Sequence, residues 1–507
     1  RSRANENRTA LFQQWWPIGP AAIGKRVPST VTCRTVPHGL MFMNLPISKR
    51  VQAEITVNVL AGPRRLGTVA SFLSRKRYVP VWLKFAVTLL LALAWGVSSY
   101  LIARHWLDEL ALIMGSFSAH LVIFGIAILP GFMNAFLVVG LLLDRRPPRT
   151  AIATYPGITV LVAAYNEQDS ILSTLESLSK QDYPAPMQVL VINDGSTDAT
   201  MERLRSVSYP WLQVLDLERN GGKANALNQG LKLAGHSLTI TLDGDSYLYR
   251  HALRHLVGRF LSDPPSTSAV AGAVLLRNSR LNLVTRVQEW DYFHGIAAIK
   301  RLQSLFQGTL VAQGAFSLYR TEVLRELGGW PECVGEDIVL TWAMLNRGDR
   351  VGYCEDAVTF TNAPTTWRQF IRQRQRWSRG LIEAFKAYPQ LLFRRRMSTI
   401  FIWWNLLFPY MDLVYTLFFL PGLLLALFGC YWLAGPMTLL VLPLAFVVNY
   451  LMFYIQSQMF RAQGLKVRRN PVGFVMYALF YGFVLQPGCV VGYLSELLNL
   501  RKHWGTK

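Results

Sequence analysis

The sequence has few charged side chains for its length. Only 16% of its 507 residues are Asp, Glu, Lys or Arg, whereas 51% are hydrophobic. A typical soluble protein carries about 25% charged residues, so the composition excludes a disordered charged chain and an ordinary cytosolic enzyme. It favours a membrane protein with a sizeable soluble part. The length predicts more than one structural unit, since a typical domain has about 150 residues.

Acidic residues are especially scarce. The chain has 30 Asp and Glu against 52 Lys and Arg, which gives a formal net charge of +22. A basic excess can indicate nucleic acid, anionic lipid or an anionic substrate as the partner. Here the basic clusters lie beside long apolar stretches, which is the positive-inside pattern of membrane proteins. The sequence has neither zinc-finger spacing nor an RRM-type aromatic motif, so we expect no nucleic-acid partner.

Cysteine pairs and a secretion signal are also missing from the sequence. The five cysteines are odd in number, and no two have metal-ligand spacing, so free thiols are expected rather than a disulfide framework. Residues 1–78 lack the apolar core of a signal peptide and show no sustained period. They are predicted to be a basic, weakly ordered cytoplasmic arm.

Long apolar runs divide the rest of the chain. Within residues 79–149, two predicted transmembrane helices are each long enough to cross the ~30 Å hydrocarbon core. Residues 396–507 predict an interfacial helix and about three transmembrane segments, the last of which Pro487-Gly488 could break. Basic flanks then place residues 150–395 in the cytoplasm of a multi-pass protein of the inner (plasma) membrane. The predicted spans are Val81–Ala103, Phe117–Leu143, Leu413–Leu433, Met437–Met459 and Val472–Leu498, and the interfacial helix is Met397–Leu407.

Residues 150–395 have a different sequence pattern, in which short apolar runs alternate with amphipathic helical segments. The period of Ile171, Leu175 and Leu178 predicts a helix between two of the runs. Alternation of strands and helices predicts an α/β domain with a largely parallel sheet. The predicted buried strands are Gly157–Ala164, Gln188–Ile192, Leu238–Leu242 and Ala269–Leu275.

Polar motifs follow three of these strands. In an open α/β sheet, ligands bind at the carboxyl ends of the strands, so the three loops are expected to meet in one cleft. Hard oxygen ligands with no His or Cys nearby suit Mg²⁺ or Mn²⁺ bound together with phosphate, and the Asp-Gly-Asp motif is the candidate for such a site. The alternative is an ordinary surface turn. The motifs are Asn166-Glu167, Asn193-Asp194-Gly195-Ser196 and Asp243-Gly244-Asp245.

Two further motifs stand at predicted helix starts. Gly221-Gly222-Lys223 could bind phosphate through a helix N-terminus and a lysine, although it is not a Walker A loop, and a solvated lysine is the alternative. Glu336-Asp337 could supply a general base for a sugar hydroxyl. Acidic residues that complement a helix dipole are the alternative for that pair.

The last motif combines a glutamine, an arginine and a tryptophan on a predicted helix that begins near Thr366. Trp377 offers a flat face for a sugar ring, and Arg376 can neutralise a diphosphate. The alternative is a basic amphipathic helix resting on the membrane. That alternative rests on the surrounding basic residues Arg368, Arg372, Arg374 and Arg379.

Taken in this order between apolar spans, the motifs resemble those of the family 2 inverting glycosyltransferases. The resemblance covers about residues 80–507 and is closest to the membrane-embedded processive synthases, above all bacterial poly-N-acetylglucosamine synthases. It implies a GT-A-like domain, with a Rossmann-like mixed sheet, inserted between transmembrane helices. It also implies Mg²⁺ or Mn²⁺ as cofactor, a growing glycan and the lipid bilayer as partners, and an optional small membrane accessory subunit.

The resemblance assigns roles residue by residue. Asn166, Glu167 and Asp194 would hold the uracil and ribose, with Lys223 near the nucleotide. Asp243 and Asp245 would match the metal-binding DxD, with Asp245 the direct ligand. Asp337, beside Glu336, would match the catalytic base. Gly314 would line the acceptor end, and the QxxRW motif would be matched by Gln373, Arg376 and Trp377.

The implied reaction is transfer of GlcNAc from UDP-GlcNAc to a β-linked polysaccharide that is exported across the membrane. Gly335 and Gln313 depart from the family's common TED and Ser-Gly, which leaves chitin-, hyaluronan- and cellulose-type products open. A non-processive transferase acting on a lipid carrier also stays open. A transporter with a regulatory domain is disfavoured because the long apolar runs carry few ionisable residues, with Lys84 and Asp412 near their ends.

Overall fold

The computed structural model describes residues 79–145, 152–462, 464–465 and 467–500. The chain divides into two units, Arg1–Arg77 and Tyr78–Lys507, and the described residues all belong to the second unit. The predicted arm at residues 1–78 therefore lies outside the described residues.

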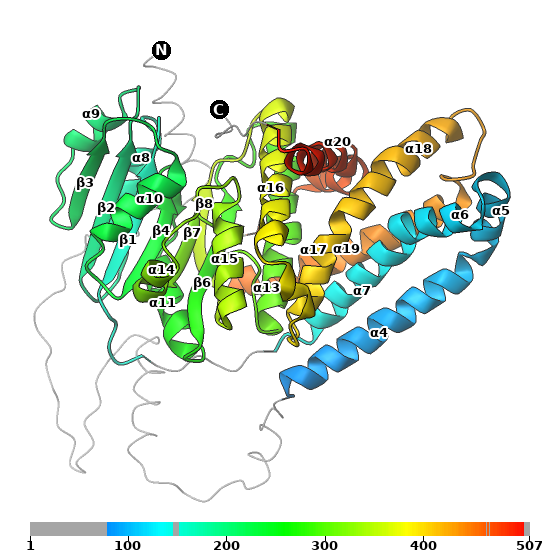
Figure 1. Ribbon diagram of the computed structural model, residues 1–507, viewed down its shortest axis with the longest axis horizontal. Coiled ribbons are helices and arrows are strands. Elements are labelled where there is room, and N and C mark those ends of the chain that lie inside the picture. The colour runs from blue at the N-terminus through cyan, green and yellow to red at the C-terminus, as the bar shows by residue number, and fades with distance from the viewer. Residues whose placement is uncertain (1–78, 146–151, 463, 466, 501–507) are drawn as a thin grey trace, which may run out of the picture. The chain divides into compact units, whose positions relative to one another are not determined.

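An eight-stranded mixed sheet forms the centre of the α/β part (Figure 1). Its order is β3-β2-β1-β4-β7-β6-β8-β5, with β3, β2, β1 and β4 parallel to one another. Strand β7 runs antiparallel to both of its neighbours, whereas β6 and β8 are parallel. The strands are β1 (Ile158–Ala164), β2 (Met187–Asp194), β3 (Leu212–Leu217), β4 (Leu238–Asp243), β5 (Tyr247–Leu248), β6 (Thr267–Leu276), β7 (Phe316–Arg320) and β8 (Arg350–Thr361).

The four predicted strands are confirmed as β1, β2, β4 and β6. Nearly every residue of β1 and β4 is buried, because helices cover the sheet and leave these strands no polar face. The elements around the sheet are α8 (Ile171–Ser179), α9 (Thr200–Arg205), α10 (Lys223–Lys232), α11 (Ala252–Ser262), α12 (Leu283–Trp290), η2 (Asp291–Ile296), α13 (Ala297–Leu305), α14 (Thr321–Glu326), α15 (Glu336–Arg347), α16 (Trp367–Ala387) and η3 (Pro389–Phe393).

Long apolar helices flank this α/β part on both sides in sequence. Four helical runs among the described residues are long and apolar enough to cross a membrane: Val81–Ile102, Ser116–Leu142, Thr399–Ala426 and Pro471–Leu497. The elements are α4 (Val81–Ile102), α5 (Arg104–Met114), α6 (Ser116–Ile123), η1 (Phe124–Ile128), α7 (Leu129–Leu142), α17 (Thr399–Val414), η4 (Tyr415–Phe419), α18 (Leu420–Ala426), α19 (Pro436–Ala462) and α20 (Pro471–Leu497).

The C-terminal helices differ from the sequence prediction in two ways. The expected interfacial helix Met397–Leu407 is not separate, because one helical run continues from Thr399 to Ala426. Its Trp404 is 5% exposed and packs 5.5 Å from the Phe136 ring, so this tryptophan stabilises a core rather than an interface. The last segment is also unbroken, since Pro487 lies inside the continuous helix α20.

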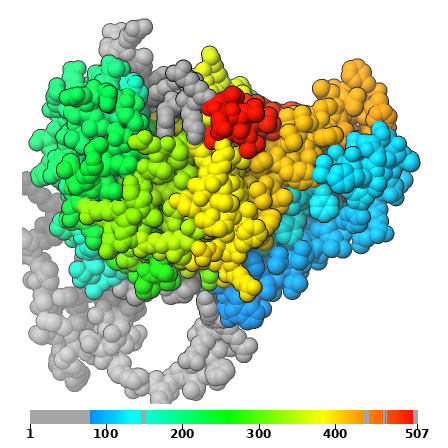
Figure 2. All heavy atoms as spheres, viewed as in Figure 1, coloured from blue at the N-terminus to red at the C-terminus, as the bar shows by residue number. Residues whose placement is uncertain are grey.

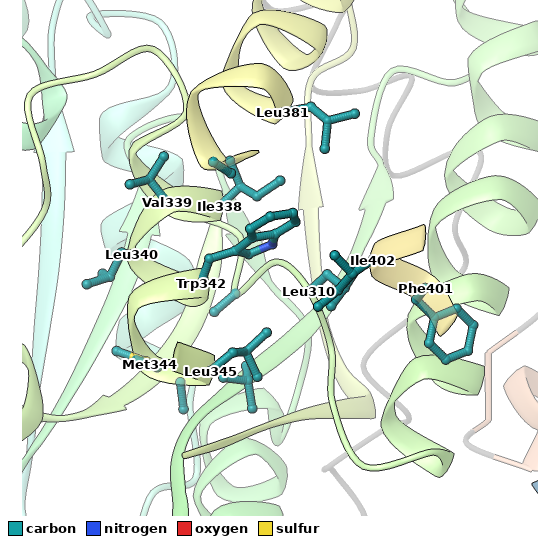
Figure 3. Close-up of a cluster of buried hydrophobic side chains, with 14 of the residues drawn as sticks. Leu310, Ile338, Val339, Leu340, Trp342, Met344, Leu345, Leu381, Phe401 and Ile402 are labelled. Atoms are coloured by element: carbon teal, nitrogen blue, oxygen red, sulfur yellow. The ribbon is translucent and has the colours of Figure 1, made fainter. Parts of the chain in front are cut away.

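Helix α16 stands between the α/β part and the apolar helices. In the space-filling view its yellow surface separates the green sheet elements from the orange and blue helices (Figure 2). A hydrophobic cluster joins α15, α16 and α17 around Trp342, which is 0% exposed (Figure 3). Members of this cluster include Leu310, Ile338, Val339, Leu340, Met344, Leu345, Leu381, Phe401 and Ile402.

The start of α15 touches α16 backbone to backbone. A Cβ on Gly380 would lie 2.7 Å from the Gly335 Cα atom, a distance that real Cβ contacts do not show. The carboxylate of Glu383, also on α16, accepts N–H bonds from Gly335 at 2.8 Å and Val334 at 3.3 Å. These bonds satisfy backbone donors that a helix start would otherwise leave unpaired. The close contact therefore fixes Glu336-Asp337 against α16.

Gly380→Ala is expected to force α15 away from α16, because the added methyl group meets backbone rather than a flexible side chain. Overpacking of this kind costs typically about 1–3 kcal/mol. The matched control is Gly488→Ala in α20, where the new Cβ would make an ordinary 3.6 Å contact with Ile371. Thermal unfolding of the purified protein should show a lower midpoint for Gly380→Ala and not for Gly488→Ala. Equal midpoints would contradict the close contact.

Candidate active site

The loops after β1 and β2 form one structure at the carboxyl edge of the sheet. Asn166 has a positive φ of 55°, its N–H donates to Ser196 Oγ at 3.0 Å, and its Oδ1 accepts from Thr197 N at 2.8 Å. The Glu167 N–H donates to Thr200 Oγ1 at 2.8 Å. The two predicted donor-binding loops are thus hydrogen-bonded to each other, because they follow the neighbouring strands β1 and β2.

Asp194 positions the next motif. Its two carboxylate oxygens accept N–H bonds from Gly221 and Gly222, each at 2.9 Å, and the side chain is buried. Gly222 has φ +87°, a conformation that residues with a side chain rarely adopt. The resulting turn places Lys223 at the first position of α10. In this structure Asp194 therefore acts on the glycine turn, and its role toward a nucleotide stays a prediction.

Lys223 is the cation at the centre of the site. Its Nζ forms an ion pair with Asp243 Oδ1 at the end of β4. Burial alone would lower the pKa of Lys223, but the charges of Asp243, Glu336 and Asp337 outweigh it and raise the pKa. The lysine stays protonated, and it links the Asp-Gly-Asp loop to the start of α15.

Asp245, the second carboxylate of the Asp-Gly-Asp loop, is half-buried. Burial raises the pKa of its carboxyl to about 7, and the charges of Asp243 and Glu167 act in the same direction. The Thr361 hydroxyl, at the end of β8, donates to both carboxylate oxygens at 3.1 and 3.2 Å. Sequence reasoning missed Thr361 because it belongs to no motif and lies far along the chain.

The acidic pair at the start of α15 faces the same region. Asp337 Oδ2 accepts an N–H bond from Gly314 at 3.3 Å, and a Cβ on Gly314 would lie 2.8 Å from Lys223 Nζ. Glu336 is 8% exposed, and burial together with the Asp337 charge raises the pKa of its carboxyl to about 7. Glycine at position 314 thus lets its own loop approach the lysine closely.

Helix α16 brings the last motif to this acidic pair. Arg376 is close enough for its charge to act on Glu336, and it counteracts the rise in the pKa of that carboxyl. Among the described residues, Gln373 Oε1 and Arg376 Nε are buried without a hydrogen-bond partner, which leaves both available to a ligand. Trp377 remains 43% exposed.

The alternative of a membrane-resting basic face is wrong for two of the arginines on which it rested. Arg374 and Arg379 are 4% and 8% exposed, not solvated. Arg379 forms an ion pair with Glu496 of α20 at 3.3 Å. Only Arg368 and Arg372 of that set are exposed. Sequence periodicity could not reveal Glu496 as a partner of Arg379, since it lies on a distant helix.

No group of three or more His, Cys, Asp or Glu side chains within the described ranges is arranged to hold a metal ion by itself. Asp243 and Asp245 offer two carboxylates on one loop, with Asp243 already paired to Lys223. Mg²⁺ is usually held by one or two carboxylates and completed by substrate phosphates and water. The donor set therefore fits a divalent cation that arrives with a nucleotide diphosphate.

Comparison with known proteins identifies the family of the α/β domain. The family described as "Glycosyltransferase like family 2" matches residues 156–380. These residues form a family 2 glycosyltransferase domain. The match covers β1 to β8 and the QxxRW motif of α16, so the glycosyltransferase domain contains all the candidate site residues named above. Its mixed sheet is of the GT-A type.

Curated relatives match the chain over part of their length. The poly-β-1,6-N-acetyl-D-glucosamine synthase of Staphylococcus aureus strain MSSA476 is 32% identical over 265 residues, which are 50% of this chain. The same enzyme of Staphylococcus epidermidis is 30% identical over 263 residues. The chain spans 63% of the length of these curated relatives.

A solved glycosyltransferase structure also resembles the chain. A mannosyltransferase of Pyrobaculum calidifontis, in complex with GDP-Man and Mn²⁺, aligns with a TM-score of 0.48 and 17% identity. The alignment covers 83% of this chain and 100% of that one.

Glu336→Gln tests the burial of the acidic pair. The folded state binds the Glu336 proton more tightly than the unfolded chain, because its pKa is raised from 4.5 to about 7. Wild-type stability relative to the variant should be greatest below pH 4.5, fall as pH rises toward 7, and stay at its lowest level above pH 7. Thermal unfolding of both proteins between pH 4.5 and 8 measures this difference. A difference that does not change with pH would show that Glu336 is solvated.

Proposed function

We propose that the protein transfers N-acetylglucosamine from UDP-GlcNAc to a growing β-linked glycan, with inversion at the sugar carbon. The observation that carries this proposal is the meeting of the Asp243 loop and the Asp337 helix on one lysine, Lys223. Donor-side and acceptor-side groups thus lie around a single cation. The likeness to the staphylococcal synthases supports the choice of sugar.

The proposed donor site comprises the loops after β1, β2 and β4. Asn166, Glu167 and Asp194 would hold the nucleoside, while Asp243 and Asp245 would hold Mg²⁺ or Mn²⁺ beside the diphosphate. The cation, when bound, would neutralise charge on the departing diphosphate. Arg376 would supply a second positive charge through its unpaired buried nitrogen.

The proposed acceptor site lies on the other side of Lys223. The Asp337 carboxylate takes the proton of an acceptor hydroxyl, and that oxygen then forms a bond to the anomeric carbon. The bond from this carbon to the diphosphate breaks on the opposite face, so an α-linked donor gives a β-linkage. Gly314, Gln373 and Trp377 would line the acceptor, with the Trp377 ring stacking on a sugar.

The apolar helices suggest where the product goes. We propose that the four long apolar runs are transmembrane and that α19, which covers the predicted span Met437–Met459, is the fifth span. The glycosyltransferase domain would then lie on the cytoplasmic face of the plasma membrane. The adjacent helices would carry the glycan outward during processive synthesis, with a small accessory subunit as an optional partner.

The proposal is tested by incubating the purified protein with UDP-GlcNAc, UDP-Glc and UDP-GlcA in separate reactions, each with a glycan primer. UDP release should occur with UDP-GlcNAc, and a hydrolase specific for β-1,6-linked N-acetylglucosamine should degrade the product. A product of one sugar on a lipid carrier, or release with another donor only, would contradict the proposal.

Asp337→Asn should bind the donor normally but turn over about 10²–10⁴-fold more slowly, since it lacks the general base.

Asp245→Asn tests the cation. The variant should lose transfer while it stays folded, because an amide is a poorer ligand for a hard cation than a carboxylate. EDTA should have the same effect on the wild type, and added Mn²⁺ should restore it. The matched control is Asp169→Asn, an exposed aspartate of the same domain. Full wild-type activity in EDTA would overturn the metal assignment.

A further inference from the structure

Arg374 is a buried cation that the proposed mechanism does not use. It follows Gln373 on α16, and its Nη2 lies 2.8 Å from Asp291 Oδ2. The two side chains are only 5% and 12% exposed. Removing one partner of a buried ion pair is strongly destabilising, because the remaining charge is left uncompensated. Asp291 is therefore what keeps the Arg374 guanidinium inside the protein.

The guanidinium lies against two aromatic rings of its own helix. Its Cζ is 3.9 Å from the centroid of the Trp377 ring and 4.9 Å from that of Phe370. Side chains three and four residues apart are neighbours on a helix surface. A cation within about 6 Å of a ring is attracted to its face, and more so when water is excluded. Arg374 therefore covers part of the Trp377 ring and holds it in one orientation.

Asp291 reaches α16 from a separate element. It is the first residue of the π-helical turn η2, and such turns are frequent at functional sites. A Cβ on Gly295 would lie 2.9 Å from Asp291 Oδ1, so glycine at that position leaves room for the carboxylate. The next residue, Tyr292, has its ring centroid 6.4 Å from that of Trp377. The turn thus brings a negative charge to Arg374 and an aromatic ring to Trp377.

We infer that Asp291 is a positioning residue that fixes the acceptor-facing tryptophan, Trp377, through Arg374. This inference rests on the proposed function for its kinetic consequence, but not for its geometry. With the carboxylate removed, the guanidinium loses its counter-charge and turns toward water, and the ring loses the cation on its face. The acceptor then meets a mobile ring instead of a fixed one.

The kinetic test compares Asp291→Asn with Asp291→Glu. The amide should raise the KM for the glycan primer about 10- to 100-fold, the range expected for a misplaced positioning group, while the KM for the nucleotide sugar stays unchanged. Asp291→Glu should restore most of the primer affinity. Trp377→Phe should raise the primer KM as well, and the double variant should be no worse than the worse single variant. Effects that multiply, or that raise both KM values, would overturn the inference.

Two further variants serve as controls. In Asp291→Leu/Arg374→Met both charges are gone, and an apolar replacement of a buried pair is often tolerated by the fold. This variant should fold and still show the raised primer KM, and a normal KM in the folded double variant would overturn the inference. Glu202→Gln, an exposed carboxylate of α9, should match the wild type. If it too raised the primer KM, the effect would not be specific to Asp291, and the inference would fall.

A spectroscopic test is independent of activity. The purified protein is labelled with fluorotryptophan, and the Trp377 signal among the 15 tryptophans is identified as the one missing from Trp377→Phe. Asp291→Asn should shift or broaden that signal, and Asp291→Glu should leave it in place. An unchanged signal in Asp291→Asn would overturn the inference even if transfer is confirmed. Absence of transfer by the wild type would refute the proposed function alone.

Discussion

The contact between Gly335 and Gly380 is the constraint on which the arrangement of the site depends. Neither residue has a Cβ, so α15 and α16 meet at backbone distance just before Glu336-Asp337 and just after Trp377. Glu383 then accepts the backbone N–H of Gly335, which ties the start of α15 to α16. The acidic pair and the tryptophan motif belong to one rigid corner because of this contact. The hydrophobic cluster around Trp342, which joins α15, α16 and α17, stabilises this contact.

Several ionisable side chains with perturbed pKa values lie close together in the candidate site. Burial raises the pKa of both Asp245 and Glu336 to about 7, while Lys223 stays protonated between them. Titratable groups with strongly perturbed pKa values in one place are typical of functional sites. A nucleotide diphosphate and a divalent cation would complete the balance of charges. The family 2 glycosyltransferase domain gives this electrostatic pattern its chemical interpretation.

Part of the α/β domain could be predicted from the sequence, because local sequence patterns mark four of its strands and the loops that follow three of them. The buried strands are short apolar runs, and the motif loops follow directly from three of them. Strands β3, β5, β7 and β8 were not predicted, and nothing in the sequence marks β7 as a strand that runs against both of its neighbours. The order of the loops in the sheet is sufficient to bring Asn166, Asp194 and Asp243 to one edge.

Partners from distant elements could not be predicted. Arg374 and Arg379 look like solvated residues of a basic helix, but Asp291 and Glu496 bury them. Thr361 carries no motif signal and is recognised only by its bonds to Asp245. The segment Met397–Leu407 was predicted to be an interfacial helix, yet its Trp404 packs on Phe136 and the segment belongs to a continuous apolar run. In each case the side chain has the expected chemistry, and the tertiary structure gives it a different partner.

The most direct test of the central claim is a cryo-electron microscopy map of the full chain with UDP and Mn²⁺. The account predicts density for the diphosphate and the cation between Asp245 and Arg376, with the uracil against the loops of Asn166 and Asp194. The Asp337 carboxylate should face the open side of that density, where an acceptor would bind. Nucleotide density away from the carboxyl edge of the sheet, or on the side of α16 opposite Asp337, would contradict the account.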